Sequence, residues 1–304
     1  MTPWPPTLER LRDTVGLWTT VTEGLEPEKS QELAGEIESL GYSALWIPEA
    51  WGREALSNAT MLVLATSRIT VATGIANIWA RDAVSAMNAA KTLTALSHER
   101  FVLGLGVSHQ PLVERMRGHH YERPLASMAS YLAAMDAAPM FAPEHAARVP
   151  RVIAALGPKM LELARDATDG AHTYLVTPEH TTSARLILGD KFLAVEQALV
   201  LGQSREEFLA RAHAHLEIYT GLDNYRASWR RLGFTDEDFV RGGSERLCDA
   251  MVLHGDDDAV LERVQEHRQA GADHVCLQVL GGDLTSVPLD EWRRMSAALA
   301  PKQG

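Results

Sequence analysis

The chain has 304 residues, 46% of them hydrophobic, so it can bury one large core or two modest ones without disulfides or metals. Acidic residues outnumber basic ones by 40 to 29, and the formal charge of -11 argues against nucleic acid as the main partner. The only cysteines, Cys248 and Cys276, form no CxxC and support neither a disulfide framework nor a zinc cluster; a reducing cytoplasm is expected. Residues 1–15 lack the apolar stretch of a signal peptide, and no run of about 18 apolar residues predicts a membrane span.

Short apolar segments alternate with longer, helix-like segments along most of the chain. Pro27 suits a first helical turn, and Asp82 suits an N-cap. The predicted strands are 15–18, 42–48, 68–75, 100–106, 150–156, 170–176, 192–202 and 274–280. The predicted helices are 27–40, 58–67, 82–97, 124–138, 158–168, 179–188 and 289–300.

Residues 202–270 break this rhythm and predict several helices with no strand. Strands that alternate with helices indicate a parallel sheet, and eight such units fit a closed (β/α)₈ barrel better than an open, doubly wound sheet. No shift in composition marks a boundary, so residues 1–304 are expected to form one α/β domain with a helical insertion before the last strand. In such a barrel the functional residues follow the strands, at the C-terminal rim.

The stretch RFVLGLGVSH, residues 100–109, places two glycines at the end of a predicted strand. A dinucleotide fingerprint would need a third glycine where His109 stands, a P-loop would need Gly-Lys-Ser/Thr, and a nucleophile elbow would need a glycine after the serine. What remains is a barrel strand whose glycines let a flat or bulky group lie against the backbone, with Ser108 and His109 at its edge. The alternative is that Gly104 and Gly106 only relieve crowding inside the barrel.

Several stretches in a fixed order resemble the luciferase-like superfamily of flavin and deazaflavin oxidoreductases, and within it the branch that uses coenzyme F420. The resemblance covers almost the whole chain and implies a TIM barrel with a tricyclic ring across the strand ends. The stretches are residues 41–54, 69–83, 100–115, 152–181 and 270–280.

The resemblance implies a non-prolyl cis peptide bond behind the cofactor ring, and the matching bond joins Gly74 to Ile75. The Ile75 side chain is then expected to press on the ring, with Asn77 near its polar edge. Gly106, Val107 and Ser108 are expected to lie beside the cofactor.

Two predicted helix starts offer free backbone N–H groups to a phosphate. In LGPKM, Leu156, Gly157 and Pro158 precede or open a helix, and Lys159 adds charge. In VTPEHT, Thr177 can cap the helix, while His180 and Thr181 offer donors. By position against the family, Tyr174 and Thr177 fall where the cofactor's tail phosphate is held.

Candidate catalytic residues are His109, which titrates near neutrality, and Glu49. Relatives often carry an Asp-His pair where this sequence has Glu49 and Ala50, which argues against an alcohol dehydrogenase mechanism that relies on this histidine. Trp18 and Trp51 are expected to line a substrate pocket. Arg53 is expected to be a solvated charge on a loop and not part of an anion-binding site. Seven other histidines match no metal-ligand spacing and are expected on the surface: His119, His120, His213, His215, His254, His267 and His274.

The sequence therefore predicts an F420-dependent oxidoreductase that transfers a hydride between the deazaflavin and a small organic substrate. Two alternatives remain open, an FMN-dependent monooxygenase and a flavin-binding protein without turnover. The resemblance also implies a homodimer.

Overall fold

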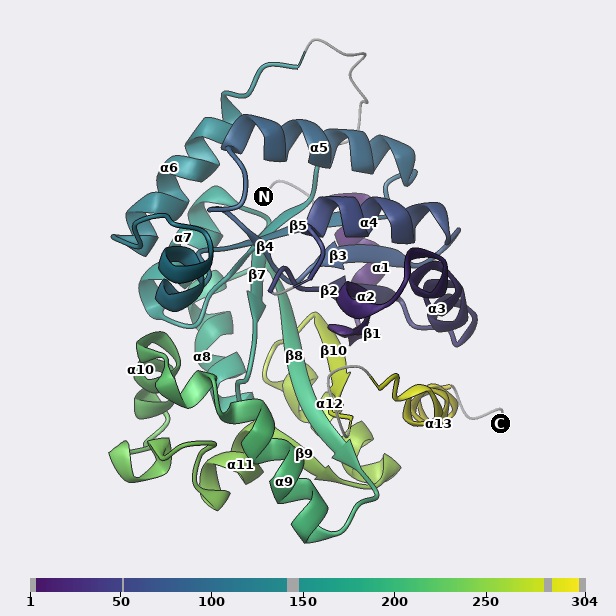
Figure 1. The fold of residues 1–304 in the computed structure, drawn as a ribbon, viewed down its shortest axis with the longest axis vertical. Helices are drawn as coiled ribbons and strands as arrows, with labels where there is room; N and C mark the ends of the chain where they lie inside the picture. The colour runs from purple at the N-terminus through teal and green to yellow at the C-terminus, as the bar shows by residue number, and fades with distance from the viewer. Residues whose placement is uncertain (1–3, 51, 141–147, 282–285, 301–304) are drawn as a thin grey trace.

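Eight parallel strands close into a barrel (Figure 1) in the computed structural model, which describes residues 4–50, 52–140, 148–281 and 286–300. Strand β10 pairs with both β8 and β1, which closes the ring and confirms the predicted TIM barrel. The barrel strands are β1 (Thr14–Trp18), β2 (Ala44–Ile47), β3 (Thr70–Thr73), β5 (Phe101–Gly106), β6 (Arg151–Ala154), β7 (Gly170–Thr173), β8 (Phe192–Leu201) and β10 (His274–Val279).

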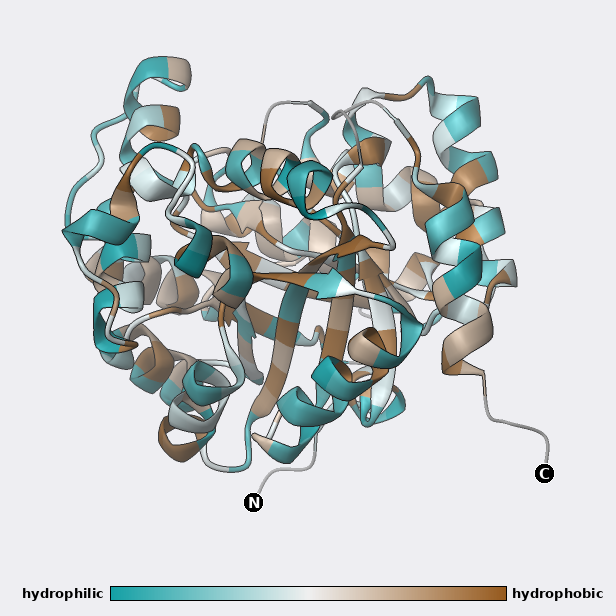
Figure 2. Ribbon diagram, turned by 90° about the horizontal axis from the view of Figure 1, so that it is seen from below, coloured by the Kyte–Doolittle hydropathy of each residue, from teal (hydrophilic) through white to brown (hydrophobic). Residues whose placement is uncertain are grey.

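Helices pack around this barrel and turn their polar faces outward, as the hydropathy colouring of Figure 2 shows. Among the described residues, no helix is long and apolar enough to span a bilayer. The surrounding helices are α3 (Pro27–Ser39), α4 (Ala55–Leu64), α5 (Ala83–Leu96), α6 (Pro124–Asp136), α7 (Pro158–Ala167), α8 (Pro178–Leu188), α12 (Asp257–Gln269) and α13 (Leu289–Leu299), with short α1 (Pro6–Leu11) and α2 (Val21–Gly24) near the N-terminus.

Large aromatic side chains fill the barrel interior. The ring of Trp46 stacks on that of His172 at 4.6 Å, and its Nε1 donates to Nε2 of His274 at 3.1 Å. A Cβ atom on Gly16 would lie 2.7 Å from the ring of His274, so glycine is required opposite these bulky groups. Tight packing of this kind fixes the barrel wall and hence the positions of the strand ends.

The insertion between β8 and β10 differs from its prediction, because it contains the strand β9 (Val252–Gly255). This strand pairs in parallel with the second half of β8, from Ala198 to Leu201. It was missed because it has only four residues and follows a helix directly, without an intervening turn signal. The other elements of the insertion are α9 (Arg205–Leu216), α10 (Asp223–Arg231), α11 (Glu245–Met251) and two short 3₁₀ helices, Tyr219–Gly221 and Asp236–Phe239.

Five histidines expected on the surface are wholly or partly buried, so that prediction was wrong for them. His267 and His274 are completely buried, whereas His213, His215 and His254 are partly buried. The absence of a metal motif says nothing about burial. Burial lowers the pKa of His267 and of His274 to about 3, so both rings are neutral at neutral pH.

Candidate functional site

The peptide bond between Gly74 and Ile75, at the end of β3, is cis, as expected. Nε1 of Trp18 donates to the Gly74 carbonyl oxygen at 3.0 Å. The next residues form the two-residue strand β4 (Ala76–Asn77), which pairs with the end of β5. The bulge therefore lies at the C-terminal rim, with the partly buried Ile75 side chain beside Gly106.

The two glycines of β5 make room for this bulge. A Cβ atom on Gly106 would lie 2.4 Å from Cδ1 of Ile75, and one on Gly104 would lie 1.9 Å from the carbonyl oxygen of Thr73. Oγ1 of Thr73 also donates to the Gly104 carbonyl at 2.7 Å and accepts from its N–H at 2.9 Å. The space that the glycines open is thus occupied by β3 and the bulge, which agrees with the crowding alternative.

Glu49 is buried and fixes the far side of the bulge. Its Oε2 accepts from the N–H of Asn77 at 2.7 Å, and its Oε1 accepts from the N–H of Ala55 and from Arg81. The side-chain oxygen of Asn77 accepts from the N–H of Trp79, so it closes a local turn. Both oxygens of Glu49 are therefore occupied by the protein itself, which suits a positioning role better than proton transfer.

The segment after β5 turns sharply at Ser108, whose φ of 56° lies in the left-handed region. The carbonyl of Val107 accepts from the indole of Trp79 at 3.0 Å. The His109 ring packs 5.8 Å from that of Tyr225 on α10. Burial lowers the pKa of His109 to about 4, so its imidazole is neutral at neutral pH.

Five rings form a continuous aromatic row that links the ends of β1, β7 and β5 with the insertion. Successive centroids lie 5.1, 5.6, 4.8 and 5.8 Å apart, within the range of favourable aromatic pairs. The row consists of Trp18, Tyr174, Tyr219, Tyr225 and His109.

The hydroxyl of Tyr174 is the polar centre of the aromatic row. It donates to Oε1 of Gln278 at 2.8 Å, accepts from the Tyr219 hydroxyl at 3.3 Å and lies 3.4 Å from Nε2 of His215. Burial raises the pKa of Tyr174 well above its usual value and lowers that of His215 to about 4. The centre is therefore uncharged at neutral pH. These contacts engage Tyr174 with the insertion, whereas the sequence predicted contact with a phosphate.

Sequence reasoning missed Glu196, a completely buried carboxyl on β8. Its Oε2 accepts from the N–H of Leu175 at 3.0 Å, and among the described residues its Oε1 has no hydrogen-bond partner. Burial raises the pKa of Glu196 to about 8. The available signal was an acidic residue within the apolar strand FLAVEQALVL. Successive side chains of a strand point to opposite faces, so Glu196 points into the barrel, as Ala194 does.

The two predicted anion sites lie next to each other, since α7 and α8 pack together. The carbonyl of Leu156, just before α7, accepts from Nε2 of His180 at 3.0 Å and from Nη2 of Arg231 at 2.9 Å. The Thr177 side chain hydrogen-bonds the Glu179 carboxyl and lowers its pKa, and Nδ1 of His180 is a buried acceptor, because this histidine is neutral and donates through Nε2. The groups that fit phosphate oxygens are therefore the free backbone N–H groups at the two helix starts and the Arg231 guanidinium. Arg231, from the insertion, was not predicted.

Several predicted donors are already occupied. Oγ1 of Thr181 contacts Nδ1 of His267 at 2.9 Å, and Lys159 is exposed on α7. Arg53 donates to the carbonyls of Thr22 and Leu25, at 2.6 and 2.5 Å, and so binds loop backbone. The predicted pocket residue Trp51 lies outside the described residues.

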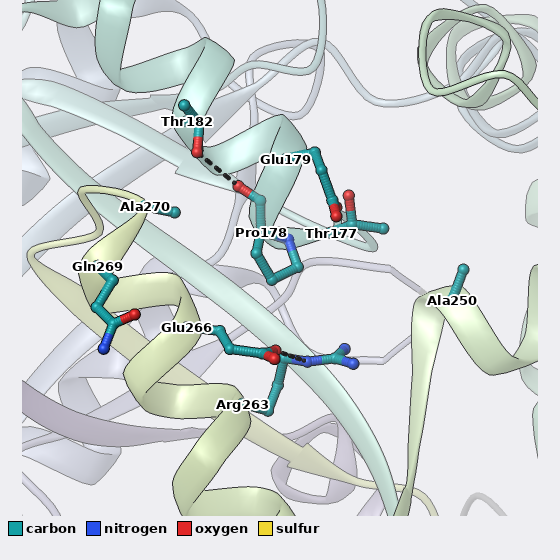
Figure 3. Close-up of a pocket in the computed structure, with 9 residues that line it drawn as sticks. All are labelled: Thr177, Pro178, Glu179, Thr182, Ala250, Arg263, Glu266, Gln269 and Ala270. Atoms are coloured by element: carbon teal, nitrogen blue, oxygen red, sulfur yellow. Dashed lines mark hydrogen bonds and ion pairs between the residues drawn. The ribbon is translucent and has the colours of Figure 1, made fainter.

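A groove of about 530 Å³ opens between the start of α8 and α12 (Figure 3). Arg263 pairs there with Glu266 at 2.7 Å and also donates to Gln197 at 3.3 Å. Gln197 follows the inward-facing Glu196 on β8, so the groove lies on the outer side of the barrel wall. Thr177 and Pro178 line both this groove and the predicted anion site, whereas no residue of the aromatic row lines the groove.

Sequence comparisons find relatives of this chain among named oxidoreductases and reductases. A 5,10-methylenetetrahydromethanopterin reductase of Methanolobus tindarius is 26% identical over 246 residues, covering 74% of this chain and 68% of that protein. A Mycobacterium tuberculosis protein named for coenzyme F420-dependent oxidoreductase activity is 33% identical over 106 residues, 35% of this chain and only 30% of its own length.

Solved structures show the same fold at low identity. An F420-dependent secondary alcohol dehydrogenase with an F420-acetone adduct superposes with a TM-score of 0.73 at 13% identity, covering 95% of this chain and all of that one. The FMN complex of a type II Baeyer-Villiger monooxygenase from Pseudomonas putida gives 0.67 at 13% identity, covering 93% and 95%. The family model described as luciferase-like monooxygenase matches residues 11–274, and the chain therefore belongs to this family.

Proposed function

We propose that the protein is a coenzyme F420-dependent oxidoreductase that exchanges a hydride between the deazaflavin and a small organic substrate. The observation that carries this proposal is the partly buried Ile75 beside Gly106, on the same rim as two adjacent helix starts and the Arg231 guanidinium. The relatives named for F420 or for methylenetetrahydromethanopterin reduction favour the deazaflavin. The FMN-bound monooxygenase of the same fold supports the alternative, an FMN-dependent monooxygenase.

Residues of the rim would hold such a cofactor. The backbone N–H groups at the two helix starts and the Arg231 guanidinium suit its phosphate. The bulge and the end of β5 suit its ring. The residues assigned to the cofactor are Gly74, Ile75, Asn77, Gly106, Val107, Ser108, Leu156, Gly157, Pro158, Tyr174, Thr177 and His180, with Arg231 added from the structure.

When bound, the deazaflavin would supply the hydride donor or acceptor. His109 is neutral at neutral pH because burial lowers its pKa to about 4, so its imidazole would hydrogen-bond a substrate hydroxyl but would be a weak proton acceptor. Trp18 and the rest of the aromatic row would exclude water from the reacting groups. Glu49 would act by holding Asn77 and the bulge.

Parallel titrations with F420 and FMN, each followed by fluorescence, test this proposal. We expect F420 to bind at least about tenfold more tightly than FMN. Arg231→Gln should weaken F420 binding about tenfold, the value of one charge-assisted hydrogen bond of about 1.4 kcal/mol. Arg230→Gln is the matched control. Arg230 precedes Arg231 on α10, but its side chain pairs with Asp236 at the surface. Tighter binding of FMN would favour the alternative, and no binding of either would contradict both.

We also propose a homodimer formed through α4 and α5. Leu64 at the end of α4 and Val84 and Leu96 near the two ends of α5 are 62%, 39% and 42% exposed, and Leu96 lines a groove of about 320 Å³ between these helices. Exposed apolar side chains on adjacent helices suit a protein interface. Light scattering after gel filtration should give twice the monomer mass, and Leu96→Glu should lower it; a monomer mass for the unmodified protein would contradict this.

The buried free thiols of Cys248 and Cys276 suit a reducing cytoplasm.

A further inference from the structure

Glu196 lies in the innermost layer of the barrel, directly beneath the aromatic row. The register of β7 and β8 pairs His172 with Ala194, which places Tyr174 beside Glu196. On the other side, β10 pairs Cys276 with Glu196. The Glu196 side chain is 0% exposed, so it contacts neither solvent nor a ligand outside the barrel.

One oxygen of this carboxyl has a defined structural task. Oε2 accepts from the N–H of Leu175, whose φ of 53° is unusual for a residue with a branched side chain. The carbonyl of Leu175 accepts from Nε1 of Trp229 at 3.2 Å. Glu196 and Trp229 therefore hold the Leu175 turn from both sides, and the turn fixes the direction of Tyr174.

The other oxygen, Oε1, is buried and has no hydrogen-bond partner among the described residues. The thiol of Cys276 donates to the Val195 carbonyl at 3.3 Å, so it is already used. The Tyr174 hydroxyl donates to Gln278, which does not ionise. The titratable groups around Glu196 are His172 and Tyr174 at β7, Cys276 on β10, His215 on α9, Tyr219 in its 3₁₀ helix and Tyr225 on α10.

We propose that Glu196 is a positioning residue of the active site: its uncharged carboxyl holds the Leu175 turn, and with it Tyr174, in place, and loss of its proton leaves a buried charge that draws a neighbouring donor toward Oε1 and disturbs this arrangement. This role rests on the proposed function, because it concerns the same site. A buried carboxylate that accepts no hydrogen bond lowers the stability of the folded state. A neighbouring phenol can supply that bond if its hydroxyl turns from its present acceptor to the carboxylate. Burial supports the neutral form at pH 7, because it raises the pKa of Glu196 to about 8.

Ionisation also has an electrostatic consequence for ligands. F420 and FMN both carry phosphate, and a negative charge inside the barrel repels an anion more strongly than the same charge in water. Cofactor affinity should therefore fall as pH rises through the pKa of Glu196.

The first test uses the protein without any cofactor. The infrared band of a protonated carboxylic acid should be present at pH 7, disappear with a midpoint near pH 8 and be absent from Glu196→Gln. The tryptophan fluorescence of the protein should change over the same range, because the ring of Trp18 packs 5.1 Å from that of Tyr174, and Trp18→Phe should lose this change. Glu196→Gln, which cannot ionise, should abolish this change. Glu262→Gln, an exposed control on α12, should leave both signals unaltered.

The second test measures F420 affinity at pH 7 and pH 9. We expect the wild-type affinity to fall at least about fivefold, Glu196→Gln to be independent of pH, and Glu196→Ala to bind weakly at both values because it also loses the contact with Leu175. A carboxylate signal for Glu196 at pH 7, or tryptophan fluorescence that does not change between pH 6 and 9, would overturn the role of Glu196. Failure of F420 to bind at any pH would count against the proposed function alone, and the cofactor-free signals would still decide the role of Glu196.

Discussion

Gly104 and Gly106 occupy neighbouring inward positions on β5, but the atoms nearest to them differ. A Cβ atom on Gly104 would meet the backbone oxygen of Thr73 at 1.9 Å, whereas one on Gly106 would meet the end of the flexible Ile75 side chain. We expect Gly104→Ala to lower the free energy of unfolding by more than about 3 kcal/mol and Gly106→Ala by about 1 kcal/mol. Urea denaturation measures both, and equal losses would contradict this account.

The pair formed by Glu49 and Arg81 is nearly inaccessible to solvent, with side chains 4% and 11% exposed. Glu49→Ala would leave the N–H groups of Asn77 and Ala55 unpaired and the guanidinium with only the partly exposed Glu54, so it should lower the free energy of unfolding by about 3 kcal/mol. Glu9→Ala, which breaks an exposed pair with Arg12, should cost less than about 1 kcal/mol in the same denaturation experiment. A loss at Glu49 as small as that at Glu9 would show that the pair does not stabilise the bulge.

Residues differ in how far their roles follow from sequence. The cis bond before Ile75 could be predicted only through the resemblance to the luciferase-like superfamily, which implies such a bond at the matching position of TGIAN. Glu196 could not, because its importance depends on which face of β8 it occupies and on what lies opposite. Arg231 could not either, since it reaches Leu156 from a helix 75 residues further along the chain, and no local pattern encodes that contact.

At the scale of elements, the barrel follows from simple alternation, whereas the insertion depends on long-range packing. Helix α10 is attached to the end of β7 through Trp229, which is completely buried and donates to the Leu175 carbonyl at 3.2 Å. The strand β9 forms only because β8 extends beyond the barrel and offers it a partner. Neither contact has a signature within its own segment.

The attachment of α10 gives a prediction at this scale. Trp229→Phe keeps most of the packing but leaves the Leu175 carbonyl unpaired, so it should lower the free energy of unfolding by about 1–2 kcal/mol. Trp4→Phe removes a similar bond to the Asp190 carbonyl at the surface and should cost less than half as much. Thermal and urea unfolding of both variants measure the difference, and a larger effect at Trp4 would contradict the role of α10.

For the molecule as a whole, buried neutral histidines predict loss of stability in mild acid. The pKa of His172 falls to about 4 in the fold, and those of His267 and His274 fall to about 3, all because of burial. In the unfolded chain these histidines have the ordinary pKa of about 6.5, so the unfolded chain binds protons before the folded one as pH falls. The stability that is present above about pH 6.5 is therefore lost progressively toward pH 4 and 3. Each histidine should contribute a loss of about 2 kcal/mol between pH 6.5 and pH 5.

Glu196 acts in the opposite direction. Burial raises the pKa of Glu196 from 4.5 to about 8 in the folded chain. The stability that this shift contributes is therefore fully present below pH 4.5 and is lost as pH rises through about 8. Urea unfolding at pH 5, 6, 7 and 8.5 measures both effects. Glu196→Gln should be more stable than wild type at pH 8.5, and a constant stability between pH 7 and pH 5 would contradict the assignment of neutral histidines.

The central claim is that the rim holds a planar redox cofactor between the Ile75 bulge and the starts of α7 and α8. A crystal structure of the protein with bound F420 tests it most directly. We predict the ring against Ile75 beside Gly106, and the phosphate within hydrogen-bond distance of the backbone after Gly157 or Thr177. A ligand bound elsewhere, such as in the outer groove between α8 and α12, or a ring that does not contact Ile75, would contradict the account.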